Sequence, residues 1–379
     1  MSHSIVYHPD YQSYNFGPTH PFSPMRLVML LELLEALDAL PDFAEPALAT
    51  RDEVLTVHSE AFVEQVEAAS QGAPLPEARR YGLDTGDVPI FAGMDEATRA
   101  LVGGTLHAAR MVAAGQARCV LQLGGGLHHA GHEQAAGFCI YNDAAVAIRS
   151  LRQQGLRVAY LDIDVHHGDG VQGLFYDERD VLTISLHESG RYLYPGTGFV
   201  DELGEGEGKG FKLNVPLEPF THDASYLEAF ESVVPRALSS FQPDVLVVEC
   251  GVDAHRADPL AHLLLTTRVF ETLFRRILEL ADAHTDGRVV LTLGGGYDLD
   301  ATARLWAMLA LLVQERALPE RLPEAWLARW QQRLDQPLTP TLHDPDRDAA
   351  IERRAAIEQH NRETCQRLLE KAAPYWPNS

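Results

Sequence analysis

Five short apolar segments, each followed by glycine or charged residues, limit the possible folds of this chain more than any other feature. The segments are residues 119–123, 157–163, 181–186, 244–249 and 288–293. They are rich in Val, Ile and Leu and mostly lack polar–apolar alternation, a pattern typical of strands buried on both faces. Helical segments at 143–154, 225–239 and 266–283 lie between several of them. This alternation predicts an α/β fold with a central, mainly parallel, multi-stranded sheet and helices on both faces.

The chain of 379 residues is long enough for two domains, but large α/β sheets of this length often form one unit. We expect a single domain over 1–379, with a core at about 3–315. Beyond about residue 315 the sequence becomes polar and contains five prolines before a charged helical segment at about 347–372. Residues 316–379 are therefore predicted to form a helical appendage that packs on the same domain.

The charge of the chain restricts its partners. It has 54 acidic and 31 basic residues, a formal net charge of −23. Such a chain repels phosphate, so we expect no direct nucleic-acid binding, whereas a cationic substrate is compatible. There is no run of 18 apolar residues and no signal-peptide pattern, and the four cysteines are dispersed. These features predict a cytoplasmic protein with no membrane partner.

Polar residues follow four of the apolar segments at their C-terminal ends. They lie at residues 124–129, 162–169, 250–253 and 294–297. In an open parallel sheet, ligands bind at the carboxyl edge of the strands. Four segments that are distant in sequence are therefore expected to meet at one crevice.

The segment after residue 161 contains candidate metal ligands. Asp162, Asp164 and His166 are two residues apart and would share one face of a strand. An isolated Asp-x-His pair is more often an ordinary ion pair, but buried carboxylates must be paired or bound to metal. Asp253, at another strand end, could supply a further ligand. Two aspartates and one histidine would leave one coordination position open for water, as catalytic metal sites require.

The other polar segments contain candidate acid–base groups. His128 and His129 are adjacent, so both can face one site only from a loop, which the preceding glycines would provide. Taken alone, they could equally be two unrelated surface histidines. Asp162 and Asp169 could each orient one histidine through its Nδ1–H group. Tyr297 follows three glycines and could donate to an oxyanion, although a half-buried core tyrosine is the commoner case.

Five motifs, in this order along the chain, resemble those of one family. They are GGLHH at 125–129, GFCIYN at 137–142, DIDVHHGDG at 162–170, YPGTG at 194–198 and GGGY at 294–297. The chain resembles the histone deacetylase family in its zinc-dependent, class I-like branch, from His20 to about Trp306. In overall type it resembles bacterial acetoin-utilisation deacetylases and deacetylase-like proteins. The resemblance implies a single-domain arginase/deacetylase-type fold with the active site at the C-terminal edge of the strands.

The resemblance implies roles for the residues of the crevice. Asp164, His166 and Asp253 match the ligands of Zn²⁺, with Fe²⁺ as the alternative ion. The catalytic set matches His128, His129, Asp162, Asp169 and Tyr297. Within this set, His129 matches the general base and His128 its electrostatic or proton-donating partner. The tyrosine matches the group that polarises the acetyl carbonyl.

Substrate contacts are likewise implied by the resemblance. The matching positions are Arg26, Asp87, Gly137, Phe138, Tyr194 and Leu260. Asp87 corresponds to a rim residue that holds the substrate backbone, and Arg26 to a residue at an internal acetate cavity. The other four correspond to the wall of a narrow acyl-lysine tunnel.

The resemblance also implies bound potassium. A structural K⁺ site beside the zinc matches Asp162, Asp164, His166, Ser185 and Leu186. A second K⁺ site matches the backbone carbonyls of Phe175, Val181 and Phe211.

The chain departs from the family pattern in three places. Tyr194 stands where phenylalanine is usual, and Leu293 replaces the first of four glycines. Leu263 and Leu264 occupy a place that Phe-Asn often fills. The first two concern acyl-chain preference and the geometry of the tyrosine loop, and the third concerns local packing.

The residues and the resemblance together predict a metal-dependent amidohydrolase. It would remove acetyl or acyl groups from the ε-amine of lysine in proteins and release acetate. Acetylated small amines are the alternative substrates, which would make it an acetylpolyamine amidohydrolase. An arginase-like binuclear manganese hydrolase would need a second carboxylate in 251–253, where Asp253 stands alone. A non-catalytic acyl-lysine reader would not need His128, His129 and Tyr297 together.

Overall fold

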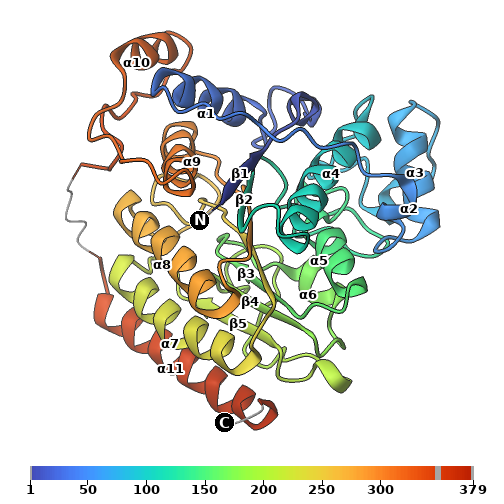
Figure 1. Cartoon of the computed structure of the whole chain (residues 1–379), viewed down its shortest axis with the longest axis vertical. Helices are drawn as coiled ribbons and strands as arrows, with labels where there is room; N and C mark the ends of the chain where they lie inside the picture. The colour runs from blue at the N-terminus through green and yellow to red at the C-terminus, as the bar shows by residue number, and fades with distance from the viewer. Residues whose placement is uncertain (1, 346–350, 377–379) are drawn as a thin grey trace.

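A seven-stranded parallel sheet forms the centre of the computed structural model, which describes residues 2–345 and 351–376 (Figure 1). The strands are β1 (His3–Val6), β2 (Cys119–Gln122), β3 (Val158–Asp162), β4 (Val181–Glu188), β5 (Lys212–Leu217), β6 (Val245–Glu249) and β7 (Val289–Thr292). Their order across the sheet is β1-β2-β7-β6-β3-β4-β5, and every neighbouring pair is parallel. The predicted α/β fold with a parallel central sheet is confirmed.

The five predicted strands correspond to β2, β3, β4, β6 and β7, with ends that differ by one or two residues. Strands β1 and β5 were not predicted. β1 has only four residues, of which two are buried. β5 lacks an apolar run because Lys212, Asn214 and Pro216 interrupt it, yet all six of its residues are buried.

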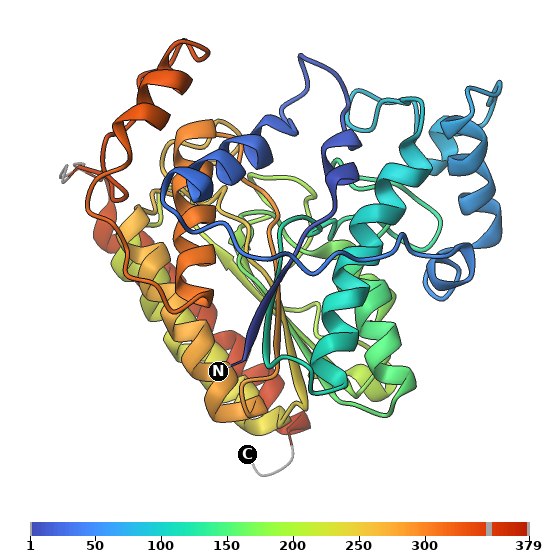
Figure 2. The same ribbon diagram turned by 45° about the horizontal axis from the view of Figure 1, so that its top comes forward.

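Helices cover both faces of the sheet, as Figure 2 shows. They are α1 (Met25–Ala36), α2 (Arg51–Val54), α3 (Glu60–Ser70), α4 (Met94–Ala113), α5 (Asp143–Gln153), α6 (Asp169–Leu174), α7 (Asp223–Phe241), α8 (Thr267–Thr285), α9 (Leu299–Val313), α10 (Glu324–Gln331) and α11 (Arg354–Ala372). On one face α4 packs against β2 and α5 against β3; on the other, α7, α8 and α9 pack against β4, β6 and β2. The predicted helices at 143–154, 225–239 and 266–283 are α5, α7 and α8.

The C-terminal helix α11 packs against α7 and the edge strand β5. Asn361 Nδ2 donates to Thr221 Oγ1 at 2.8 Å and to Ser225 Oγ at 3.0 Å. Beyond the helix, Trp376 Nε1 donates to the Gly210 carbonyl at 2.8 Å. The predicted start of this helix, at residue 347, lies outside the described residues. These contacts support our proposal that the appendage and the sheet form one domain.

The sheet order brings four strand ends together. Strands β2, β7, β6 and β3 are consecutive neighbours, and each precedes one of the four polar segments predicted to meet. Because the strands are parallel, all four segments leave the same edge of the sheet. Within the described part of the chain, no helix combines the length and apolar character that crossing a membrane requires.

Candidate active site

The glycine loop after β2 is held by the N-terminus of α5. Asn142 precedes the helix and donates from Nδ2 to the His128 carbonyl at 3.2 Å. The Asp143 carboxylate accepts from the backbone N–H groups of Gly126 at 3.1 Å and Leu127 at 2.7 Å. Gly126 has a φ of 72°, which glycine adopts readily. Although Asn142 belongs to one of the family motifs, the sequence pattern did not single out either anchor.

This loop places the two histidines against each other and against separate aspartates. His128 Nδ1 lies 2.8 Å from Asp162 Oδ2, and His129 Nδ1 lies 2.6 Å from Asp169 Oδ1. The two Nε2 atoms are 3.0 Å apart. Tyr160 adds a hydroxyl donor to Asp162 Oδ2 at 2.8 Å. The structure thus brings together the histidine–aspartate pairs that the sequence predicted.

The pKa values of the two histidines are shifted in opposite directions. Burial lowers the pKa of His128, but the Asp162 and Asp164 carboxylates outweigh it and raise that pKa to about 9. Burial, with His128 and His166 nearby, holds the pKa of His129 well below its usual range. A consistent proton arrangement has cationic His128 donating from Nε2 to neutral His129.

The predicted metal ligands meet beside this pair. One ligand atom from each of Asp164, His166 and Asp253 lies within 4.8 Å of the others, and all three residues are buried. His166 Nδ1 is 3.0 Å from Asp164 Oδ1 and 3.1 Å from Asp253 Oδ2. Of the other two carboxylate oxygens, Asp253 Oδ1 accepts from the Val165 N–H at 2.8 Å, and Asp164 Oδ2 accepts from the Gly295 N–H at 3.1 Å.

This donor set fits a divalent cation. Burial, and then the neighbouring Asp164, raise the pKa of Asp253 to about 7, so the two carboxylates disfavour each other's charge. A bound cation would remove that repulsion. Two aspartates and one histidine match the ligand types of catalytic zinc and iron sites.

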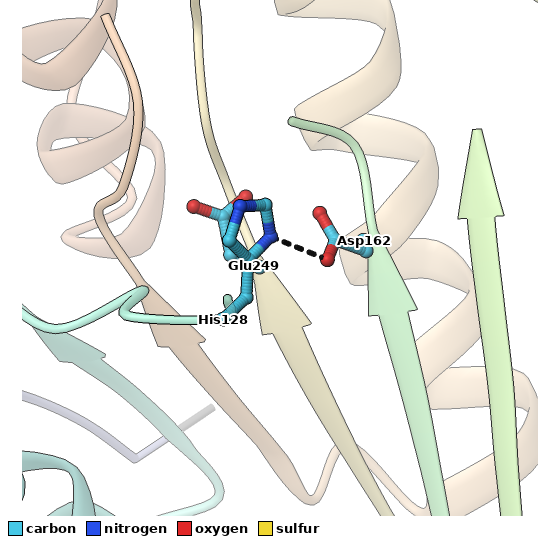
Figure 3. A group of neighbouring side chains, drawn as sticks. All are labelled: His128, Asp162 and Glu249. Atoms are coloured by element: carbon cyan, nitrogen blue, oxygen red, sulfur yellow. Dashed lines mark hydrogen bonds and ion pairs between the residues drawn. The ribbon is translucent and has the colours of Figure 1, made fainter. Parts of the chain in front are cut away.

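A second group of buried side chains lies at the same edge of the sheet and consists of His128, Asp162 and Glu249 (Figure 3). Glu249, the last residue of β6, has a carboxylate oxygen within 4.8 Å of ligand atoms of His128 and Asp162. Its Oε2 accepts from the Gly251 N–H at 2.8 Å, and its Oε1 has no partner among the described residues. Burial and the neighbouring aspartates raise the pKa of Glu249 well above its usual range. A Cβ at Gly294 would lie 1.3 Å from Oε1, so only glycine fits there.

Glu249 was not predicted as a site residue. The available signal was a carboxylate that ended an otherwise apolar strand, two residues before a glycine. A buried charged residue at such a position must be paired, protonated or bound to a ligand.

A cavity of about 260 Å³ opens onto the histidine pair and the metal candidates. The predicted site residues in its lining are Asp87, His128, His129, Gly137, Phe138, Asp164, His166, Tyr194, Leu260 and Tyr297. The structure therefore collects residues that were predicted as catalytic, metal-binding and substrate-binding from widely separated parts of the sequence around one space.

Comparison with known proteins decides the family. The model of the histone deacetylase domain matches residues 20–313. The chain belongs to the histone deacetylase family. It is 42% identical over 371 residues to the acetoin utilization protein AcuC of Bacillus subtilis, with 96% of each chain covered. AcuC of Staphylococcus xylosus is 38% identical, also with 96% of each chain covered.

Solved structures of the family share the fold. An HDAC homologue complexed with SAHA superposes with a TM-score of 0.87 at 28% identity, covering 97% of this chain and all of that chain. An HDAC homologue from Aquifex aeolicus gives a TM-score of 0.85 at 27% identity, with the same coverage.

Gly137 and Phe138 form part of the wall of this deacetylase-family cavity. The Gly137 N–H donates to Asp87 Oδ2 at 2.6 Å, which ties the predicted rim residue to the wall. Phe138 has a φ of 66°, unusual for a bulky residue. The Tyr14 hydroxyl donates to the Phe138 carbonyl at 2.6 Å and stabilises this turn. The Phe138 ring then lies edge-on to Tyr297, with centroids 5.7 Å apart.

Asp258, which was not predicted, bonds to two residues of the cavity lining. Its carboxylate accepts from the backbone N–H of Leu260 at 2.9 Å and of Tyr297 at 2.7 Å. Across the cavity, the Tyr194 ring lies 5.0 Å from the His129 ring and is 44% exposed. Because position 194 is tyrosine where the family pattern has phenylalanine, a phenol group lies at a solvent-exposed part of the cavity wall.

Arg26 lies behind the glycine loop of β7, apart from the main cavity. Its Nη1 donates to the carbonyls of Gly294 at 3.0 Å and Gly296 at 2.9 Å. Its guanidinium carbon is 4.2 Å from the ring centroid of Phe22 and 5.0 Å from that of Trp306. It lines a separate cavity of about 40 Å³. That this cavity holds acetate, as the family resemblance implies, stays a prediction.

The two predicted potassium sites differ in their surroundings. For the first, Asp162 on β3 and Ser185 on β4 are direct neighbours in the sheet register. For the second, the Val181 and Phe211 carbonyls already accept hydrogen bonds from the Lys212 ammonium group. The residues present therefore do not fit a second potassium ion.

Proposed function

We propose that this chain is a metal-dependent amidohydrolase that removes acetyl or acyl groups from the ε-amine of lysine in proteins and releases acetate. The observation that carries the proposal is the cavity in which the buried Asp164–His166 pair, the His128–His129 pair and Tyr297 meet. An HDAC homologue of the same fold binds SAHA, which supports an acetyl-lysine-like substrate here as well.

Asp164, His166 and Asp253 would hold the metal, for which Zn²⁺ is our first candidate and Fe²⁺ the second. A divalent cation supplies Lewis acidity toward a carbonyl oxygen and lowers the pKa of water toward about 7. We further propose a structural K⁺ between β3 and β4, beside the metal ligands.

The residues of the chain would then divide the proton transfers. His129 is neutral, and the Asp169 carboxylate holds its proton on Nδ1, so Nε2 carries the lone pair. Nε2 can accept a proton from the attacking water once it releases the hydrogen bond from His128 Nε2. His128 is cationic and bound to Asp162, which suits it to protonate the leaving amine or to stabilise developing negative charge. Burial raises the pKa of Tyr297 well above its usual range, so its phenol stays protonated and can donate to the oxyanion.

The cavity wall suits a neutral acyl group on an apolar stem. Phe138, Leu260 and Tyr194 provide apolar surface, and Asp87 lies at the predicted rim. Few polar groups in a mostly apolar pocket are typical of small-molecule sites. The net charge of −23 also favours a cationic substrate, so acetylpolyamines are the second candidate.

Acetate release from a panel of acyl-lysine peptides and acetylpolyamines tests the proposal. We expect the highest kcat/KM for acetyl-lysine peptides and a loss of about 10²–10⁴-fold in kcat in His129→Asn, because the general base is removed. A higher kcat/KM for acetylpolyamines would favour the second candidate. Absence of acetate with every substrate from metal-loaded protein would reject amide hydrolysis.

A further inference from the structure

Lys212, the first residue of β5, is fully buried with its ammonium group among backbone carbonyls. Nζ donates to the carbonyl oxygens of Val181 at 2.5 Å, Glu178 at 3.0 Å and Phe211 at 3.3 Å. We call these three carbonyl oxygens the carbonyl cradle. They come from the loop after α6, the start of β4 and the residue before β5, so one ammonium group ties three segments together.

The charge of Lys212 is not balanced by a carboxylate in direct contact. Within residues 2–345 and 351–376 it forms no ion pair, and the Glu178 carboxylate bonds instead to Arg149 Nη1 at 2.6 Å. Burial lowers the pKa of Lys212 to about 7, a measure of what the lost hydration costs. Backbone carbonyls therefore make all the direct contacts with this buried monovalent charge, and the Glu178 and Asp177 carboxylates act on it from a greater distance. Carbonyl oxygens coordinate K⁺ without its water shell in the same way.

The cradle coincides with the second potassium site that the family resemblance implied. Two of the three expected donors, the Val181 and Phe211 carbonyls, face Nζ. The third, the Phe175 carbonyl, accepts the Glu178 N–H at 3.0 Å, and the Glu178 carbonyl takes its place. An ammonium ion and K⁺ have similar radii and make similar contacts with carbonyl oxygens, so one can substitute for the other.

We propose that the Lys212 ammonium group is a built-in replacement for an exchangeable monovalent cation in the carbonyl cradle. The inference does not depend on the proposed function. It has a structural consequence, because the cradle follows α6, whose first residue, Asp169, bonds to His129. The end of this helix is then fixed by a covalently attached charge and does not depend on the K⁺ concentration.

Two substitutions separate the charge from the space it occupies. Lys212→Ala removes the side chain and opens the cradle, whereas Lys212→Met fills nearly the same volume without a charge. Thermal unfolding of full-length, metal-loaded protein is measured in chlorides of K⁺, Na⁺ and tetramethylammonium at equal ionic strength. Lys209→Ala is the matched control, because Lys209 is exposed and only three residues away.

We expect both variants to unfold at lower temperature than the wild type in tetramethylammonium chloride. In KCl, Lys212→Ala should regain about 3 °C more than the wild type gains between the same two salts. Lys212→Met and the control should show no such extra gain. The proposal fails if Lys212→Ala gains no more from K⁺ than the wild type, or if Lys212→Met gains as much.

Equilibrium dialysis with radioactive Rb⁺, a substitute for K⁺, counts ions without relying on stability. We expect at most one Rb⁺ per wild-type chain, from the first predicted site, and one more in Lys212→Ala. Two Rb⁺ per wild-type chain would overturn the proposal even if neither variant folded.

Discussion

Two buried clusters of this chain share one layout, in which a basic side chain lies between two aspartates. In one, Arg304 on helix α9 has its Nη2 3.0 Å from both Asp300 and Asp344. In the other, at the carboxyl edge of the sheet, His166 Nδ1 is 3.0 and 3.1 Å from the two aspartates of the candidate metal site. The distances are nearly the same, but the chemistry of the central base differs.

A guanidinium group always carries its charge, so Arg304 supplies a permanent positive charge between its two aspartates, and Arg256 Nη2 lies 3.8 Å from Asp344. His255 adds a hydrogen bond to Asp344 at 2.9 Å. An imidazole that ligates metal is neutral, and the two aspartates beside His166 then leave a charge of −2 for a divalent cation. A buried pair of aspartates is thus stabilised by the chain itself where an arginine lies between them, and is suited to bind a metal where the base between them is a neutral imidazole.

The largest expected effect comes from removing a carboxylate of the candidate metal site formed by Asp164, His166 and Asp253. Asp253→Asn should abolish metal binding and acetate release, because one of three ligands is lost. Its metal-free form should be at least as stable as the metal-free wild type, since a repelling charge is gone. Asp95→Asn is the control, a buried aspartate paired with Arg99 at 2.9 Å. Metal content and activity equal to the wild type in Asp253→Asn would break the comparison.

Removing the basic side chain of the Asp300–Arg304–Asp344 cluster should instead reduce stability. Arg304→Met leaves Asp300 buried without a cationic partner and leaves Asp344 only its contacts with His255 and Arg256. We expect a cost of about 3–5 kcal/mol in the free energy of unfolding. Arg276→Met is the matched control, because Arg276 also lies between two glutamates but at the surface. It should lose at most about 1 kcal/mol. Urea unfolding measures the loss of stability in each variant. Equal losses in Arg304→Met and Arg276→Met would show that burial of the ion pairs does not increase the cost of removing the arginine.

A substitution of Tyr297 tests whether this tyrosine contributes to the reaction rate beside the candidate metal site. Tyr297→Phe should lower kcat by about 10²–10³-fold, because one oxyanion donor is lost, while metal stays bound. Tyr226→Phe removes a different buried hydroxyl, one with no partner among the described residues, and should leave kcat unchanged. Turnover near the wild-type value in Tyr297→Phe would remove the tyrosine from the proposed reaction.

The smallest effect is a difference in pH dependence. Without metal, the pKa of Asp253 is raised to about 7 in the folded state, above about 3.9 when unfolded. The folded state then binds the proton more tightly, so this group's contribution to stability is lost as pH rises from about 4 to 7. For Asp344, burial raises the pKa, but the hydrogen bond to His255 and the charges of His255 and Arg304 outweigh burial and hold the pKa below its usual range. The contribution of Asp344 to stability is therefore lost only as pH falls.

Urea unfolding of chelated protein at pH 5 and pH 7 measures this difference. Relative to Asp253→Asn, the wild type should lose stability on the order of 2 kcal/mol between these pH values. A constant difference between the two proteins at both pH values would contradict the assigned pKa of Asp253.

The site residues that could be predicted from the sequence are those that follow apolar strands. Asp164, His166 and Asp253 follow apolar strands directly, so the parallel topology alone brings them together. Glu249 and Asp258 were missed because their roles depend on which backbone groups fold over them, and spacing along the chain does not contain this information. Asp258 bonds to two backbone N–H groups that the sequence cannot place.

The fold shows the same limit in β5. Its polar residues hide a fully buried strand, because Lys212 finds carbonyl partners on segments more than 30 residues away. A pattern of apolar residues predicts strands whose side chains contact other apolar groups. It does not predict a strand whose buried charge is solvated by the backbone of neighbouring segments.

The most direct test of the central claim is the number of divalent metal ions per chain, measured by elemental analysis together with acetate release. We predict one ion per chain, lost with the activity on chelation and regained with it when Zn²⁺ or Fe²⁺ is added. Two ions per chain, or full activity in metal-free protein, would contradict a single-metal site built on Asp164, His166 and Asp253.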